Sequence, residues 1–212
     1  MNRHCAIHLF MLLLVCCGVA STACAQSEAE SKAPYQMPSP KGWGRERIKL
    51  PPAFAPKMNW KGHEDLRFAP GMFNPKSDSF LSYDVLFWTE GERAPTQKEL
   101  QQEITTYYQG LSKALLAGRK PGLKPMQTVV KLKAVESHNK TLLDKRPEGR
   151  YVGELVWTEP FVTAAKQTLR LELDVHKHDG RICVFVCASP QKLDAKVWKQ
   201  LRKIRDGVKF AK

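Results

Sequence analysis

Apolar side chains recur at helical spacing in one long segment, and this pattern predicts the longest helix of the chain. Thr96 and Glu99 have the spacing of a capping box, in which the two side chains bind free backbone N–H groups of the first helical turn. Gly118 and Pro121 end the pattern, because glycine is common just after a helix and proline cannot continue one. The apolar stripe consists of Leu100, Ile104, Tyr107, Leu111 and Leu115.

A second pattern, dense in β-branched and aromatic residues, predicts the strands. The stretch 80–89 is apolar on both sides, which is typical of a strand covered on both faces. Residues 169–178 alternate between apolar and polar, and the Asp-Gly pair after them predicts a two-residue hairpin. Prolines exclude a helix from 50–75, where one edge strand is expected at 64–68. The other expected strands are 127–135, 151–158 and 181–188.

A shorter helix is expected near the C-terminus. It begins at an Asp194 cap, runs to about Asp206 and stops at Gly207. Its apolar stripe consists of Val197, Leu201, Ile204 and Val208. The order of elements predicts an α+β fold, in which two main helices pack an antiparallel sheet of four to six strands.

The N-terminal segment has the pattern of a secretory signal peptide. Arg3 supplies a positive charge, residues 6–19 are apolar, and Ala23 and Ala25 form an A-x-A cleavage motif. The apolar run is shorter than the roughly 20 residues that cross a bilayer. Cleavage after Ala25 predicts an exported protein, periplasmic or extracellular. The alternative is a membrane-anchored lipoprotein in which Cys24 carries the lipid.

Removal of a signal peptide at 1–25 changes the organisation of the chain and its cysteine count. Residues 26–44 are rich in Ser, Pro, Gly and Ala and predict a flexible tether, which leaves 45–212 as a single domain with a Pro-rich N-terminal arm. Cys183 and Cys187 are the cysteines that remain. A regular strand would separate them by about 13 Å, beyond the roughly 7 Å that a disulfide spans, so both are expected to be free.

Positive charge is concentrated in two segments. The chain has 34 Lys and Arg against 21 Asp and Glu, a formal charge of +13, and 42% hydrophobic residues, which together exclude a wholly disordered chain and a polytopic membrane protein. Segment 119–150 has nine basic and three acidic residues, and segment 190–212 has eight and two, so each carries +6. Loss of Arg3 with the signal peptide leaves +12, and the remainder of the mature chain is neutral.

The C-terminal helix carries part of this charge on one side. Lys196, Lys199, Arg202 and Lys203 lie across the side opposite the apolar stripe, whereas Arg205 falls near the stripe, where it either extends to solvent or meets a carboxylate. A solvated helix face explains the pattern without any function. A functional interpretation is a surface for an acidic glycan, anionic lipid headgroups or an acidic protein. Nucleic acid is a poor partner for an exported chain without aromatic stacking motifs.

The predicted hairpin brings several reactive side chains to one face of the sheet. Counting back from the turn pairs His178 with Arg181 and His176 with Cys183. Two histidines and a thiol on one face are candidates for a transition-metal site or a Cys-His pair, so His176, His178 and Cys183 are singled out. A half-covered sheet face with polar residues at its wet end explains the same pattern without chemistry, and no spacing here is a metal signature.

The remaining motifs give no catalytic assignment. The sequence has no glycine-rich phosphate loop, and the His63-Glu64 pair lacks the second histidine of a metalloprotease. No catalytic residue is assigned and no cofactor is expected.

The tryptophans divide into two groups. Trp88, Trp157 and Trp198 lie within strand or helix patterns, which predicts that they are buried. Trp43 and Trp60 lie in irregular, Pro- and Gly-rich sequence and are the candidates for exposed contact. Packing of the N-terminal arm onto the sheet is the alternative for both.

Several segments, and the order of the elements, resemble a known arrangement. The segments are WGRER (43–47), LRFAPGMF (66–73), PFVT (160–163) and RICVFVCASP (181–190). Over residues 43–210 the chain resembles the PsbP-like α/β/α sandwich and an uncharacterised secreted bacterial protein family. PsbP-like domains are mostly non-enzymatic, so the resemblance implies an exported, non-catalytic binding or accessory domain. The alternative is a hydrolase or metal-dependent enzyme that uses the His176/Cys183 hairpin face.

Overall fold

The computed structural model describes residues 34–136 and 147–211, which belong to two compact units. The smaller unit contains strand β1 (Tyr35–Gln36) and Phe210 of strand β9 (Lys209–Phe210), and these short strands form a separate two-stranded sheet. The rings of Tyr35 and Phe210 meet edge to face, with their centroids 6.2 Å apart. The larger unit, 37–209, contains the main sheet and both helices.

The main sheet has seven strands, and every neighbouring pair is antiparallel. Its strands are β2 (Gly44–Leu50), β3 (Gly62–Phe68), β4 (Tyr83–Glu90), β5 (Val129–Ala134), β6 (Gly149–Thr158), β7 (Lys166–His178) and β8 (Arg181–Ser189). The strand order β2-β3-β4-β8-β7-β6-β5 joins two meanders, and the connection between them crosses from β4 to the far edge at β5.

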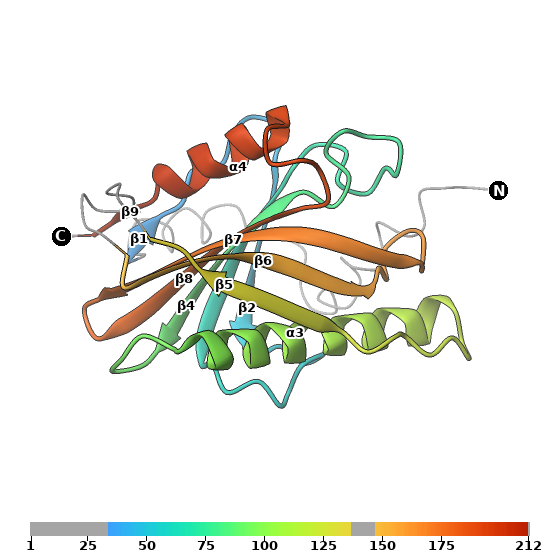
Figure 1. Ribbon diagram of the computed structural model, residues 1–212, viewed down its shortest axis with the longest axis horizontal. Helices are drawn as coiled ribbons and strands as arrows, with labels where there is room; N and C mark the ends of the chain where they lie inside the picture. The colour runs from blue at the N-terminus through green and yellow to red at the C-terminus, as the bar shows by residue number, and fades with distance from the viewer. Residues whose placement is uncertain (1–33, 137–146, 212) are drawn as a thin grey trace, which may run out of the picture. The chain divides into compact units, whose positions relative to one another are not determined.

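Two helices cover opposite faces of this sheet (Figure 1). Helix α3 (Gln97–Arg119) forms the crossover between the meanders, and helix α4 (Lys196–Asp206) follows β8. The predicted α+β class, with two helices packed on an antiparallel sheet, is confirmed. The expected count of four to six strands is too low, since the sheet has seven.

Strand β2 is the strand that the sequence pattern missed. Its segment, GRERIKL, contains four charged residues and lies at the edge of the sheet, where β3 is its one neighbouring strand and its other edge faces solvent. The segment therefore has few apolar residues, and the alternation that marks a strand is weak in it. Strand β3, expected at the edge, lies between β2 and β4.

The β7–β8 hairpin has the predicted register. His178 pairs with Arg181 and His176 with Cys183. Asp179 and Gly180 have φ angles of 46° and 70°, the left-handed conformations that a tight two-residue turn requires. The Asp-Gly signal therefore fixes which side chains share each face of this hairpin.

Helix α3 begins with the predicted capping box. The Thr96 side chain accepts a hydrogen bond from the backbone N–H of Glu99 at 3.3 Å, and the Glu99 carboxylate accepts one from the backbone N–H of Thr96 at 2.7 Å. The expected Asp194 cap of α4 is wrong. That helix starts at Lys196, so Ala195 occupies the cap position and provides no side-chain hydrogen bond.

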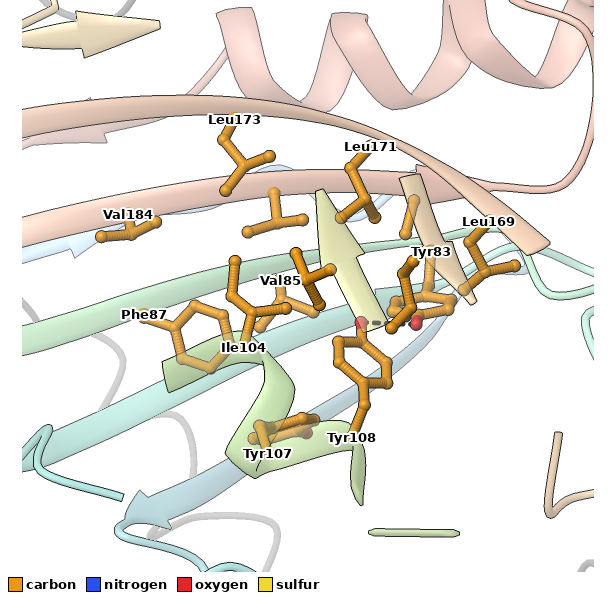
Figure 2. Packing of buried hydrophobic residues seen from close by; sticks show 14 of the residues in the cluster. Tyr83, Val85, Phe87, Ile104, Tyr107, Tyr108, Leu169, Leu171, Leu173 and Val184 are labelled. Carbon is orange, nitrogen blue, oxygen red and sulfur yellow. Dashed lines mark hydrogen bonds between the residues drawn. The ribbon is translucent and has the colours of Figure 1, made fainter. Parts of the chain in front are cut away.

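The face of the sheet beneath α3 holds the apolar core (Figure 2). Side chains of α3 interdigitate there with alternate residues of β4, β7 and β8. Tyr83 and Tyr108 are fully buried, and their hydroxyls form a 2.6 Å hydrogen bond. The labelled residues in Figure 2 are Tyr83, Val85, Phe87, Ile104, Tyr107, Tyr108, Leu169, Leu171, Leu173 and Val184.

Glutamine side chains of α3 form hydrogen bonds with backbone groups of the edge strand β5 and of Thr128 just before it. The side-chain amide of Gln97 donates to the carbonyl of Leu132 at 2.9 Å, and Gln101 accepts from the N–H of the same residue at 2.8 Å. Gln109 accepts from the N–H of Thr128 at 2.6 Å. Because the N–H and carbonyl of Leu132 in the middle of β5 are already bonded, these contacts oppose the pairing of another strand at that position.

Two glycines of α3 provide a matched test of its packing. A methyl group at Gly110 would collide with the backbone carbonyl of Phe54, whereas one at Gly118 would meet nothing within 4 Å. Alanine is favoured over glycine in a helix by about 1 kcal/mol. We expect Gly118→Ala to raise the free energy of unfolding by up to about that amount, and Gly110→Ala to lower it. Urea denaturation measures both, and a stabilising Gly110→Ala would contradict this packing.

The buried Glu64 carboxyl makes the stability of the fold depend on pH. Burial, the largest cause, raises its pKa to about 8, while a 3.1 Å hydrogen bond from Tyr107 opposes the shift and the nearby Glu46 and Asp65 carboxyls add to it. The Glu64 carboxyl ionises near pH 4.5 in the unfolded chain and near pH 8 in the folded chain. The folded state is therefore not penalised below pH 4.5, and the free energy of unfolding falls as the pH rises from 4.5 to 8.

We therefore expect Glu64→Gln to flatten the decline in melting temperature between pH 5 and 8. The slope attributable to this group is at most about 1.4 kcal/mol per pH unit. Glu92→Gln, which changes an exposed carboxyl, is the matched control and should leave the pH profile unchanged. A Glu64→Gln profile that follows the unmodified protein would show that another group dominates the dependence.

Candidate basic surface and its buried charge network

The face of the sheet opposite the apolar core is lined by charged and polar side chains. The strand register places Arg67, Asp84, Cys187 and Glu172 in one row across β3, β4, β8 and β7. Asp84 is fully buried, and none of the described N–H or O–H groups donates to its carboxylate. Burial raises the pKa of Asp84 well above its usual value, while the Cys187 thiol and the Arg205 guanidinium oppose the shift.

Arg205 joins α4 to this polar face. Its guanidinium lies 3.2 Å from Glu172 and 3.5 Å from Asp174, and it also pairs with Asp206 on its own helix. The Arg205 side chain is only 9% exposed. Of the two alternatives for Arg205, contact with a carboxylate is the one that the structure shows, and two of its partners, Glu172 and Asp174, come from strand β7.

Arg150 of β6 completes the network from the other side. Its guanidinium binds both oxygens of Asp174, at 2.6 and 2.9 Å. The sequence pattern does not single out Arg150, because the connection between β6 and β7 lacks a two-residue turn like the Asp-Gly pair between β7 and β8, so the register that pairs Arg150 with Asp174 cannot be counted from it.

Arg202, predicted to bind an anion, is already engaged within the fold. It binds the Glu172 carboxylate through two nitrogens, at 2.6 and 3.0 Å, and donates to the carbonyl of Leu193 at 3.1 Å. Its guanidinium also lies over the ring of Trp198, 5.4 Å from the centroid. Arg202 therefore belongs to the attachment of α4, although its side chain is still about one-third exposed.

Lys196, Lys199 and Lys203 form the exposed ridge of α4. They are spaced at i, i+3 and i+7, which places them on one side of the helix, and all three are exposed. The opposite side is buried and contains Val197, Leu201 and Ile204 among its apolar residues. No carboxylate within the described ranges forms an ion pair with any of the three lysines.

Two hollows flank Arg202. The first, of about 240 Å³, is lined by Arg150, Tyr151, Val152, Glu172, Asp174, Arg202 and Arg205. The second, of about 580 Å³, is lined by Lys199, Arg202, Lys203, Asp206 and Gly207. In the first hollow an anion would have to displace an internal carboxylate. The second opens along the lysine ridge and leaves the ammonium groups of Lys199 and Lys203 available.

The His176/Cys183 face is buried, and both groups favour their neutral forms. Burial, the largest cause, lowers the pKa of His176 to about 4 against the opposing charge of Asp174, and its Nε2 atom has no hydrogen-bond partner among the described residues. Burial also raises the pKa of the Cys183 thiol well above its usual value. A nucleophilic cysteine requires the thiolate, which this environment disfavours.

His178, the third candidate ligand, lies at the end of the hairpin. Its ring is 6.2 Å from that of Trp88, and its Nε2 atom is 3.3 Å from the Asp179 carboxylate. Across positions 34–136 and 147–211, no three His, Cys, Asp or Glu side chains are arranged to hold a metal ion.

In the second basic segment, 119–150, some basic side chains bind groups within the fold and others are exposed. Arg119 donates to the carbonyls of Pro160 and Val162, and Arg150 pairs with Asp174. Lys131 and Lys133 are exposed on the edge strand β5. Residues 137–146 lie outside the described part of the chain, so the segment does not present a continuous basic surface within it.

The tryptophans are buried throughout. Trp88, Trp157 and Trp198 are core residues, as predicted. Of the two alternatives for Trp43 and Trp60, exposed contact is wrong and packing against the fold agrees with the structure, since both are buried. Trp60 packs edge to face against Phe87 with the centroids 5.0 Å apart, so the Pro-rich arm contributes an anchor to the apolar core.

The predicted signal peptide, Cys24 and residues 26–33 of the tether lie outside the described residues. Residues 34–44 include β1 and the buried Trp43. None of the described helices has the length and hydropathy needed to cross a bilayer.

Comparisons with known proteins identify no relative of this chain. No protein-family model, curated protein or solved structure matches the chain. The features that carry the interpretation are the exposed lysine ridge, the buried charge network beneath it and the closed hairpin face.

The two described cysteines should resist modification while the protein is folded. Cys183 and Cys187 are free and fully buried, and burial raises the pKa of each thiol. We expect neither to react with iodoacetamide at pH 8 until urea unfolds the chain, as measured by peptide mass mapping. A Lys196→Cys variant supplies an exposed thiol that should react at once. Rapid native labelling of Cys183 would revive the hairpin face as a reactive site.

Proposed function

We propose that this protein is an exported, non-catalytic binding or accessory domain that contacts a polyanionic partner through the outer face of α4. The observation that carries the proposal is the ridge of Lys196, Lys199 and Lys203, three exposed ammonium groups on one side of a helix without a described carboxylate partner. The N-terminal signal pattern supports export. The resemblance to PsbP-like domains agrees with a binding role and remains a prediction.

The buried charges beneath α4 support this assignment. Glu172 and Asp174 are the carboxylates of β7 that pair with α4, and both are bound by arginines. They are therefore occupied and do not neutralise the lysines on the opposite side of α4. An incoming anion meets an uncompensated positive ridge, which attracts it over about a Debye length, roughly 10 Å at 0.1 M salt.

The state of the hairpin face favours binding over catalysis. A neutral buried histidine and a protonated buried thiol provide neither a poised base nor a nucleophile. The candidate enzyme function on His176 and Cys183 therefore has no supporting observation.

A charge-reversal experiment tests the proposed surface. The triple substitution of Lys196, Lys199 and Lys203 by Glu should abolish retention on a heparin matrix, or reduce the eluting salt concentration at least about twofold, because ionic attraction to the ridge becomes repulsion. The measurement is the elution position of the full chain in a salt gradient.

The control changes the same charge elsewhere. Lys57, Lys61 and Lys113 are exposed and lie outside both basic segments, so their triple substitution by Glu alters net charge equally. An equal loss of retention in this control would show that net charge, and not the α4 ridge, governs binding. Absence of retention by the unmodified protein would refute the proposal.

A further inference from the structure

We propose that the anionic partner is a phospholipid bilayer surface, contacted by the lysine ridge of α4 together with Leu193. This inference rests on the proposed function, because it names the class of partner for the same face. It depends on a second feature that a purely ionic surface would not need, which is an exposed apolar side chain beside the lysines.

Leu193 is that side chain. It is 44% exposed, and the other exposed large apolar side chains in the described ranges, Phe73, Leu123 and Val129, belong to other elements. Exposed lysines flank Leu193 in sequence, Lys192 directly before it and Lys196 at the start of α4. The hydrogen bond from Arg202 to the Leu193 carbonyl, at 3.1 Å, holds this turn against the helix. The leucine is therefore presented at the N-terminal end of the ridge.

A bilayer surface can satisfy both the lysines and Leu193, because its charged and apolar layers lie one beneath the other. Phosphate groups lie outermost and hydrocarbon lies just beneath them, so ammonium groups and a short apolar side chain can be satisfied together. Lysine stems can also lie along apolar surface while their charged ends remain among the phosphates. An acidic glycan or an acidic protein would satisfy the lysines but would leave Leu193 without a specific role.

A shallow, open hollow lies beside the ridge. Its lining includes Lys199 and Lys203, whose side chains are exposed and can meet a phosphodiester headgroup, and Arg202, which is held by Glu172. The one carboxylate in the lining, Asp206, accepts a hydrogen bond from Arg205 at 2.9 Å, which compensates its charge. Asp194 is the exposed acid adjacent to Leu193, and four lysines between residues 192 and 203 outnumber it.

Vesicle co-sedimentation of the mature chain, residues 26–212, tests the inference without the apolar residues 6–19 of the predicted signal peptide, which would bind vesicles by themselves. The protein should bind vesicles of equal parts phosphatidylcholine and phosphatidylglycerol, but not vesicles of phosphatidylcholine alone, and added salt should weaken the binding. Leu193→Ser should reduce the partition coefficient roughly three- to tenfold, because it removes the apolar contact, and should leave retention on heparin unchanged.

Leu123→Ser is the matched control. Leu123 is 43% exposed and is also close to lysines in sequence, Lys120 and Lys124, but it follows α3, which covers the face of the sheet opposite α4. We expect this variant to bind vesicles like the unmodified protein. An equal loss in Leu123→Ser, or no loss in Leu193→Ser, would overturn the assignment of the contact to α4.

The outcomes separate this inference from the proposal on which it rests. Retention on heparin without vesicle binding would refute the bilayer partner and leave a polyanion-binding domain, with a soluble acidic glycan or protein as its target. Failure to bind either material would refute both. Binding to phosphatidylcholine alone would refute the ionic role of the lysines.

Discussion

The ion pairs of Arg205 with Glu172 and Asp174 determine which side of α4 faces solvent, and the surface proposed for binding depends on that orientation. The apolar stripe of α4 defines a broad contact that tolerates some rotation of the helix about its axis. A buried guanidinium that reaches two carboxylates of β7 removes that tolerance, because any rotation would leave charges buried without partners. Such pairs add little net stability, since burying charge is costly, but they are expensive to break. With Arg205 fixed inward, Lys199 and Lys203 point outward.

The two faces of the main sheet differ in character, one apolar and one charged. The face under α3 is apolar and is closed by aromatic contacts such as that between Tyr108 and Trp157, whose ring centroids are 5.0 Å apart. The face under α4 contains acids and arginines that neutralise one another. The network takes up arginines and acids in equal number, so it leaves the excess of positive charge, +13 for the whole chain, unchanged. The lysines of α4 lie outside this network and are exposed to water.

Local sequence signals predicted the features that depend on a few neighbouring residues. The Thr96–Glu99 capping box and the Asp179-Gly180 turn were correct because their geometry is decided within a few residues. Strand β2 and the engagement of Arg202 were missed because both depend on partners distant in sequence: β2 is specified by pairing with β3, and Arg202 by Glu172, 30 residues away. The same limitation affected Trp60, whose burial requires β4 as a packing partner. The sequence pattern alone did not show which cations of the candidate helix are engaged within the fold, because the pairing of Arg202 with Glu172 is a tertiary contact.

The turn before α4 links the internal network to the proposed docking face. Arg170 donates to the carbonyl of Pro190 at 2.7 Å, Trp198 to that of Gln191 at 3.0 Å, and Arg202 to that of Leu193 at 3.1 Å. Successive carbonyls of the turn are therefore held by side chains of β7 and α4. A turn fixed in this way loses little conformational entropy when it meets a partner, which strengthens binding by a surface with few contacts. Arg202 both pairs with Glu172 and binds the Leu193 carbonyl, so the stability of the polar layer and the geometry of the exposed surface are physically coupled.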